Sequence, residues 1–71
     1  MTTTVIGLGR FGRCMATLLS PHAPVNYLDP NVNDTNFARI DTAALSQSER
    51  VFLCVPISQM QSVLATIAPH L

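Results

Sequence analysis

Short apolar blocks recur along the chain and predict a series of strands. The β-branched segment 3–6 and the segment 25–28 are both bounded by glycine, proline or aspartate, as strands are. The run 51–55 is apolar throughout, which favours a strand buried on both faces, as in a parallel sheet. Segment 31–40 has little periodicity, and there we expect a loop or a short irregular helix with a brief strand near 37–40.

Segment 11–19 has the pattern of an amphipathic helix. Its apolar residues recur at the 3.6-residue period that marks one helix face. This stripe consists of Phe11, Cys14, Met15, Leu18 and Leu19. Ser20-Pro21 ends the helix, since proline disfavours helical backbone in the residue before it.

Two further helices are predicted in the second half of the chain. Asp41 is typical of a helix N-cap and opens a short helix through Leu45 to about Ser48. Ser58 with Gln61 forms a capping-box pattern, in which two side chains satisfy backbone N–H groups at a helix start. Behind this pattern, one helix face is marked by Met60, Val63, Leu64, Ile67 and Leu71.

The order of these elements predicts an α/β fold. Strands that alternate with helical segments favour a parallel sheet, here of about four strands, with flanking helices and right-handed crossovers. With 71 residues the chain is at most one domain, residues 1–71. Only 11% of its residues are charged, against roughly 25% in an ordinary soluble domain. We therefore expect more chain or a partner to cover part of its surface.

A glycine loop follows the first strand directly and leads into the first helix. The loop is Gly7-Leu8-Gly9-Arg10-Phe11-Gly12. In a dinucleotide-binding fingerprint the first glycine permits the tight turn, the second lets a pyrophosphate approach the backbone, and the third allows close helix packing. The helix N-terminus then directs unpaired N–H groups at the phosphates. The loop predicts an incomplete Rossmann-type fold; the alternative is a glycine turn that binds nothing.

Asp29 stands at the end of the second strand, about 20 residues after the loop, where the fingerprint expects an acid that binds the adenosine ribose. A carboxylate there also repels a 2′-phosphate, which favours NAD over NADP. Arg10 or Arg39 would weaken that preference if either reached the 2′ position. The alternative interpretation of Asp29 is a turn residue in Asp29-Pro30-Asn31.

Val55 and Pro56 form a second candidate cofactor contact at the end of the apolar run. Ligands of open α/β sheets bind at the carboxyl ends of strands. If the strand order is 3-2-1-4, the strand 51–55 lies beside the strand 3–6 and its end faces the cofactor. Alternatively, Pro56 only ends a strand and starts a helix.

Charge and composition exclude several other classes of function. The formal net charge is zero, without the basic patch that a nucleic-acid partner requires. No apolar run reaches about 18 residues, and residues 1–4 do not resemble a signal peptide, so we expect neither membrane insertion nor export. Cys14 and Cys54 lack metal-ligand spacing and read as buried thiols of a cytoplasmic protein. We expect no metal site.

Several of these motifs resemble the N-terminal domain of prephenate/arogenate dehydrogenases, over nearly the whole chain. The matching segments are Val5-Ile6-Gly7-Leu8-Gly9-Arg10-Phe11-Gly12, Tyr27-Leu28-Asp29-Pro30, Val51-Phe52-Leu53-Cys54-Val55-Pro56-Ile57, Val63-Leu64 and Ala68-Pro69-His70-Leu71. The resemblance implies an oxidoreductase of tyrosine biosynthesis that oxidises and decarboxylates prephenate to 4-hydroxyphenylpyruvate with NAD(P). It places the phosphate-binding glycines at Gly7, Gly9 and Gly12 and the ribose-binding acid at Asp29.

Two departures from that family limit what the resemblance implies. The segment between Asp29 and Val51 is shorter than the family usually has. The family's catalytic histidine and its neighbouring serine lie beyond Leu71, and His70 does not match that histidine. We therefore expect cofactor contacts here but no catalytic residue, and a chain that is inactive without the remainder of the enzyme or a homodimer partner.

Two other readings compete with the oxidoreductase fragment. The same fold serves non-catalytic nucleotide-sensing modules, and other NAD-dependent dehydrogenases share the glycine loop and the strand-end proline. A third reading is a chain that does not fold stably by itself, since the crude stability balance for this size is near zero.

Overall fold

The structure is a computed structural model that describes residues 2–71, and its centre is a four-stranded sheet in which all pairs are parallel. The strands are β1 (Thr3–Ile6), β2 (Val25–Leu28), β3 (Ala38–Arg39) and β4 (Arg50–Leu53). Their order in the sheet is β3-β2-β1-β4. The helices are α1 (Arg10–Leu19), the 3₁₀ helix η1 (Thr42–Gln47), α2 (Ile57–Ile67) and the short η2 (Ala68–His70). The predicted α/β fold is confirmed, and the strand order is the 3-2-1-4 order that the second candidate contact required.

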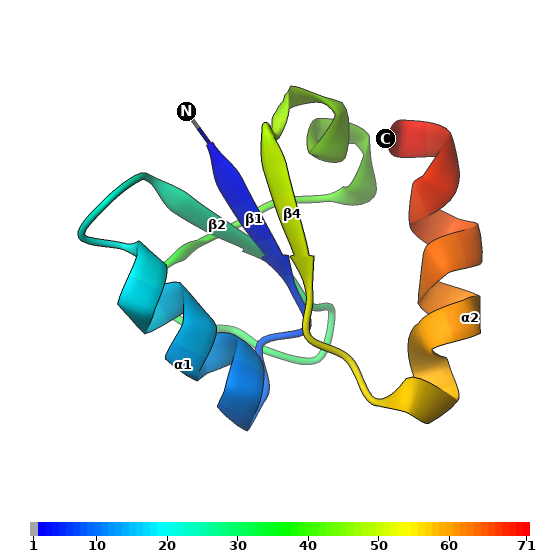
Figure 1. Cartoon of the computed structure of the whole chain (residues 1–71), viewed down its shortest axis with the longest axis horizontal. Helices are drawn as coiled ribbons and strands as arrows, with labels where there is room; N and C mark the ends of the chain where they lie inside the picture. Colours follow the sequence, from blue (N-terminus) through cyan, green and yellow to red (C-terminus); the bar gives the residue numbers. More distant parts are fainter. Residues whose placement is uncertain (1) are drawn as a thin grey trace.

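The sheet lies between two layers, with α1 on one face and η1 and α2 on the other (Figure 1). Successive residues of β1 point to opposite faces because side chains alternate along a strand. Val5 belongs to the buried cluster on the α1 face, and Ile6 to the cluster on the opposite face. The first cluster is Val5, Leu8, Ala16, Val25 and Tyr27, and the second is Ile6, Leu45 and Ile67.

Helix α1 packs through its smallest residues. Gly12 and Ala16 are buried, whereas Phe11 and Leu18 of the predicted apolar stripe are 64% and 65% exposed. A methyl group on Gly12 would overlap the Gly7 carbonyl oxygen, so the helix is closer to β1 than any side chain there would permit. The sequence located the helix correctly, but its buried face is rotated toward Gly12 and Ala16.

Helix α2 begins directly after Pro56, which is extended and serves as the N-cap. Ser58 is therefore already inside the first turn, and no side chain caps this helix, so the predicted capping box is wrong. Ile67 is its one buried residue, while Leu64 is exposed. By contrast, Asp41 caps η1 as predicted, since its carboxylate accepts a hydrogen bond from the Ala44 N–H at 3.1 Å.

Strand β4 is an edge strand and not the doubly buried one that its apolar run predicted. It pairs with β1 alone among the described residues, and Val51, Phe52 and Leu53 are only half-buried. The strand also ends at Leu53, before residues 54–55 of the predicted run. A neighbour on one side only explains the partial burial of this apolar segment.

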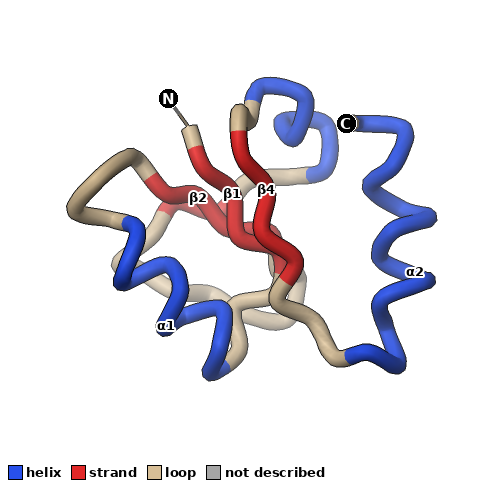
Figure 2. Tube along the Cα trace, in the orientation of Figure 1, coloured by secondary structure: helices blue, strands red, loops and turns tan. Residues whose placement is uncertain are grey.

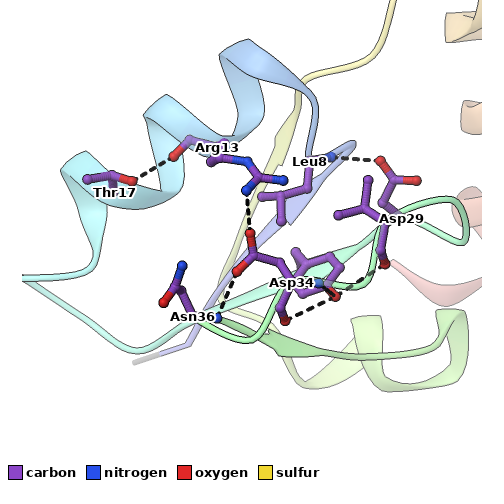
Figure 3. A network of polar contacts seen from close by, with 8 residues as sticks. Leu8, Arg13, Thr17, Asp29, Asp34 and Asn36 are labelled. Atoms are coloured by element: carbon purple, nitrogen blue, oxygen red, sulfur yellow. Dashed lines mark hydrogen bonds and ion pairs between the residues drawn. The ribbon is translucent and has the colours of Figure 1, made fainter.

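The connection between the parallel strands β2 and β3 contains no helix, and Figure 2 shows it as loop (residues 29–37). A polar cluster holds it instead. The hydroxyl of fully buried Tyr27 accepts from the Asp34 N–H at 2.9 Å, and Arg13 of α1 pairs with the Asp34 carboxylate at 2.6 Å. The Asp34 carboxylate also accepts from the Asn36 N–H at 2.7 Å (Figure 3).

Candidate functional site

A cleft of about 830 Å³ lies at the carboxyl ends of β1, β2 and β4, between the sheet and α2. Five of the predicted cofactor-binding residues line it: Gly7, Gly9, Asp29, Val55 and Pro56. The other four, Leu8, Arg10, Phe11 and Gly12, do not. The cleft is thus where strand ends meet, the position at which open α/β sheets bind ligands, and its volume is within the usual range of small-molecule sites.

Two of the three loop glycines are required by the fold itself. Gly7 has φ +90°, which side-chain-bearing residues rarely adopt, and a Cβ there would lie 2.6 Å from the Cys54 carbonyl oxygen. Gly12 is required by the close approach of α1 to Gly7. These two positions place the loop tightly between the ends of β1 and β4.

Gly9 differs, because nothing in the protein requires a glycine there. A Cβ at Gly9 would have no heavy atom within 4 Å, and its φ of −80° suits any residue. Gly9 is exposed and lines the cleft. The space around the Cβ position of Gly9 is therefore open.

The N-terminus of α1 offers backbone donors beside Gly9. The first turn closes with a bond from the Arg13 N–H to the Gly9 carbonyl oxygen at 2.9 Å. The N–H groups of Arg10, Phe11 and Gly12 precede that bond and so have no acceptor within the helix. The helix dipole adds partial positive charge there. Arg10 and Phe11 therefore offer backbone N–H donors at the start of α1, whereas their side chains lie outside the cleft.

Asp29 holds the glycine loop to the end of β2. Its Oδ2 accepts a hydrogen bond from the Leu8 N–H at 2.9 Å (Figure 3). Its Oδ1 accepts one from the Asn31 N–H at 3.0 Å. The second bond is the turn contact that the alternative interpretation predicted. Each carboxylate oxygen has further acceptor capacity, so Asp29 combines this turn role with a position at the cleft. Leu8, by contrast, has its side chain in the core and its N–H engaged.

The β4 end contributes the opposite margin of the cleft. Cys54 donates its N–H to the Ile6 carbonyl oxygen at 2.8 Å, which continues the pairing of β1 and β4 past the strand ends. Burial raises the pKa of the Cys54 thiol above its ordinary value, so this group is neutral at physiological pH. Val55 and Pro56 follow, and the half-buried Val55 supplies apolar surface.

Sequence reasoning missed two parts of this cleft. One is its apolar floor, which includes Ile6, Leu28, Ile40 and Ile67. The other is a row of polar residues on α2, namely Gln59, Ser62 and Thr66. The i, i+3, i+7 spacing of that row is present in the sequence, but spacing alone does not distinguish polar residues that face a cleft from polar residues that face solvent. Of the two arginines weighed for the 2′ position, Arg39 lines the cleft and Arg10 does not.

Within residues 2–71, no group of three or more His, Cys, Asp or Glu side chains is arranged to hold a metal ion. None of the helices described is both long and apolar enough to cross a bilayer. Cys14, predicted to be buried, is exposed, and Cys54 is half-buried; both are free thiols.

Comparisons of the chain with protein-family models, with curated proteins and with solved structures find no match. The α/β architecture and the geometry of the cleft are therefore the basis on which a function is argued.

Proposed function

We propose that this chain binds a dinucleotide, NAD(H) in preference to NADP(H), as the cofactor-binding part of an oxidoreductase. The observation that carries the proposal is Gly9. The fold explains the glycines at 7 and 12, but it leaves Gly9 unexplained, at the mouth of the cleft and beside the free N–H groups of α1. A phosphate group that must approach the backbone supplies the missing reason for a glycine.

The remaining groups fit the other parts of such a ligand. Asp29 is beside the glycine loop, with acceptor capacity suited to ribose hydroxyls. Its charge disfavours a 2′-phosphate, and Arg39 on the same cleft opposes that effect in part. NAD(H) is therefore the preferred cofactor and NADP(H) the weaker one.

We extend the proposal to prephenate oxidation, on the resemblance of the glycine loop, the Val55-Pro56 strand end and the final helix to prephenate/arogenate dehydrogenases. Hydride transfer from a hydroxyl-bearing carbon needs a proton acceptor nearby. No histidine lines the described cleft. The proposal therefore assigns cofactor binding to this chain and the general base to the remainder of the enzyme or to a second subunit.

A cleft without a histidine also suits a second candidate, a non-catalytic module that senses a nucleotide. Such a module would use the same Gly9 and Asp29 contacts. It would respond to occupancy of the cleft through a change in association or in shape, with no turnover in any assembly.

Titration of the purified chain with NADH and with NADPH, followed by reduced-nicotinamide fluorescence, tests the proposal. We expect saturable NADH binding, weaker NADPH binding, and a loss of about tenfold or more in NADH affinity for Gly9→Ala, because the added methyl group occupies the phosphate approach. Circular dichroism checks folding of each variant. A folded wild-type chain that binds neither cofactor would contradict the proposal.

A further inference from the structure

Helix α2 presents a row of polar side chains to the cleft beside its apolar residues Val63 and Ile67. The row Gln59, Ser62 and Thr66 lines the cleft, whereas Ile57 is 91% exposed and Leu64 is exposed as well. A helix that packs on a sheet buries its apolar stripe. The cleft face of α2 is therefore mixed, with hydrogen-bonding side chains at positions where a dry core would have apolar ones.

The cleft also has an apolar floor, besides the polar residues Asp29, Arg39 and Asp41 that line it. Ile6, Leu28 and Ile40 contribute apolar surface from the sheet and its margin, and Ile67 extends it from the end of α2. One wall of hydrogen-bonding groups and one apolar floor suit a flat heteroaromatic ring. Such a ring has apolar faces, and its donors and acceptors lie along its edge.

We propose that the α2 row of Gln59, Ser62 and Thr66 recognises the edge of the purine base at the adenosine end of the bound dinucleotide. This inference rests on the proposed function. There the phosphates belong to Gly9 and the ribose to Asp29, so the base is the part of the adenosine that remains for the floor and the α2 wall.

The three side chains supply both kinds of hydrogen-bonding group that a purine edge requires. The Gln59 amide offers donors and an acceptor, and the Ser62 hydroxyl offers one donor and acceptor lone pairs. The Thr66 hydroxyl donates to the Ser62 carbonyl oxygen at 3.1 Å, which leaves it available as an acceptor. Gln59 and Ser62 are therefore the residues to test.

The helix provides a matched control for each of them. Gln61 and Ser58 are exposed residues of α2 that do not line the cleft. Gln59→Ala can be compared with Gln61→Ala, and Ser62→Ala with Ser58→Ala, so each pair shares chemistry, helix and substitution. Circular dichroism with thermal melting confirms that all four variants fold.

We expect Gln59→Ala and Ser62→Ala to weaken NADH binding by about threefold to tenfold each, because one hydrogen bond to the ligand is lost. Gln61→Ala and Ser58→Ala should stay within about twofold of the wild type. A second titration uses reduced nicotinamide hypoxanthine dinucleotide, which differs from NADH only in the base. The ratio of the two affinities should change in the inner variants and stay constant in the outer ones.

Three results would contradict these proposals. Equal NADH affinity in inner and outer variants, with clear binding by the wild type, overturns the base-recognition role and leaves the proposed function standing. So does an affinity ratio that is the same in the wild type and in all four variants. A folded wild type without NADH affinity overturns the proposed function instead.

Discussion

Helices α1 and α2 flank the same sheet, but they approach it to different extents. α1 buries Gly12 and Ala16 against β1, and the backbone-to-backbone approach at Gly7 leaves no room for a side chain. α2 is held mainly at its C-terminal end, where Ile67 packs with Leu45 of η1 and Ile6 of β1, and the cleft lies between the rest of the helix and the sheet.

The difference shows that small residues, and not only large apolar ones, set the distance between a helix and a sheet. Where two glycines face each other the layers close, and the loop between them is fixed in one shape. Where polar side chains face an apolar sheet surface the layers stay apart, and a ligand site results. Four changes test this contrast, from the largest expected effect to the smallest.

Gly12→Ala should have the largest effect, since the new methyl group overlaps a backbone oxygen that cannot move without displacing β1 or α1. We expect a loss of about 3 kcal/mol or more in the free energy of unfolding, enough to unfold a small domain. Urea denaturation followed by circular dichroism measures it. Gly9→Ala is the control and should cost no more than about 1 kcal/mol, because its Cβ meets open space and only the preference of the N-cap position for glycine over alanine is lost. Equal stability of the two variants would contradict this picture of α1.

Ile67→Ala should release α2 while the α1 layer persists. Removing the one buried side chain of α2 should cost about 2–4 kcal/mol at that contact. Tyr27, the only tyrosine of a chain without tryptophan, is buried on the α1 face and reports that layer by fluorescence. We expect helical circular dichroism to melt before the Tyr27 signal. Coincident transitions would mean that both layers unfold as one unit, and Leu64→Ala serves as the exposed control.

Asp34→Asn tests the polar cluster that joins α1 to the β2–β3 connection. The Asp34 side chain is only 4% exposed, whereas that of Arg13 is 52% exposed, so solvent screens the pair in part. We expect a loss of about 1–2 kcal/mol in unfolding free energy. A double-mutant cycle with Arg13→Gln isolates the ion pair from the Asn36 contact. A coupling energy of zero would show that Asp34 acts through its backbone contacts alone.

Thiol alkylation should give the smallest effect and distinguishes the two sides of the sheet. Cys14 is exposed on α1, and Cys54 lines the cleft with a raised pKa. Since the thiolate is the reactive form, Cys54 should react at least about threefold more slowly than Cys14 near pH 8. The alkylation rate of Cys54 should continue to rise above about pH 9. Bound NADH should slow Cys54 further and leave Cys14 unchanged, as mass spectrometry can measure. Faster reaction of Cys54 would contradict the assigned burial.

The sequence predicted the strands, the α/β fold and five residues of the cleft because the patterns that indicate them are local. Glycine spacing, proline positions and apolar runs act within a few residues of where they occur. The helix faces were predicted less well. The apolar periodicity assigned Phe11 and Leu18 to the buried face of α1. Gly12 and Ala16 are buried instead, because their small size permits the close approach of the helix to the sheet. The α2 wall of the cleft was missed because its role depends on a sheet surface far away in the sequence.

Under the proposed function, the cleft between α2 and the sheet would couple folding to the concentration of the cofactor. A ligand that filled the cleft would bind only the folded chain, and at a concentration of 100 times its dissociation constant it would add about 2.7 kcal/mol to stability. For a domain this small, that is a large share of the total. The melting temperature would then rise with cofactor concentration. In a cell, the abundance of the protein would follow the nucleotide pool, since proteases remove the unliganded form first.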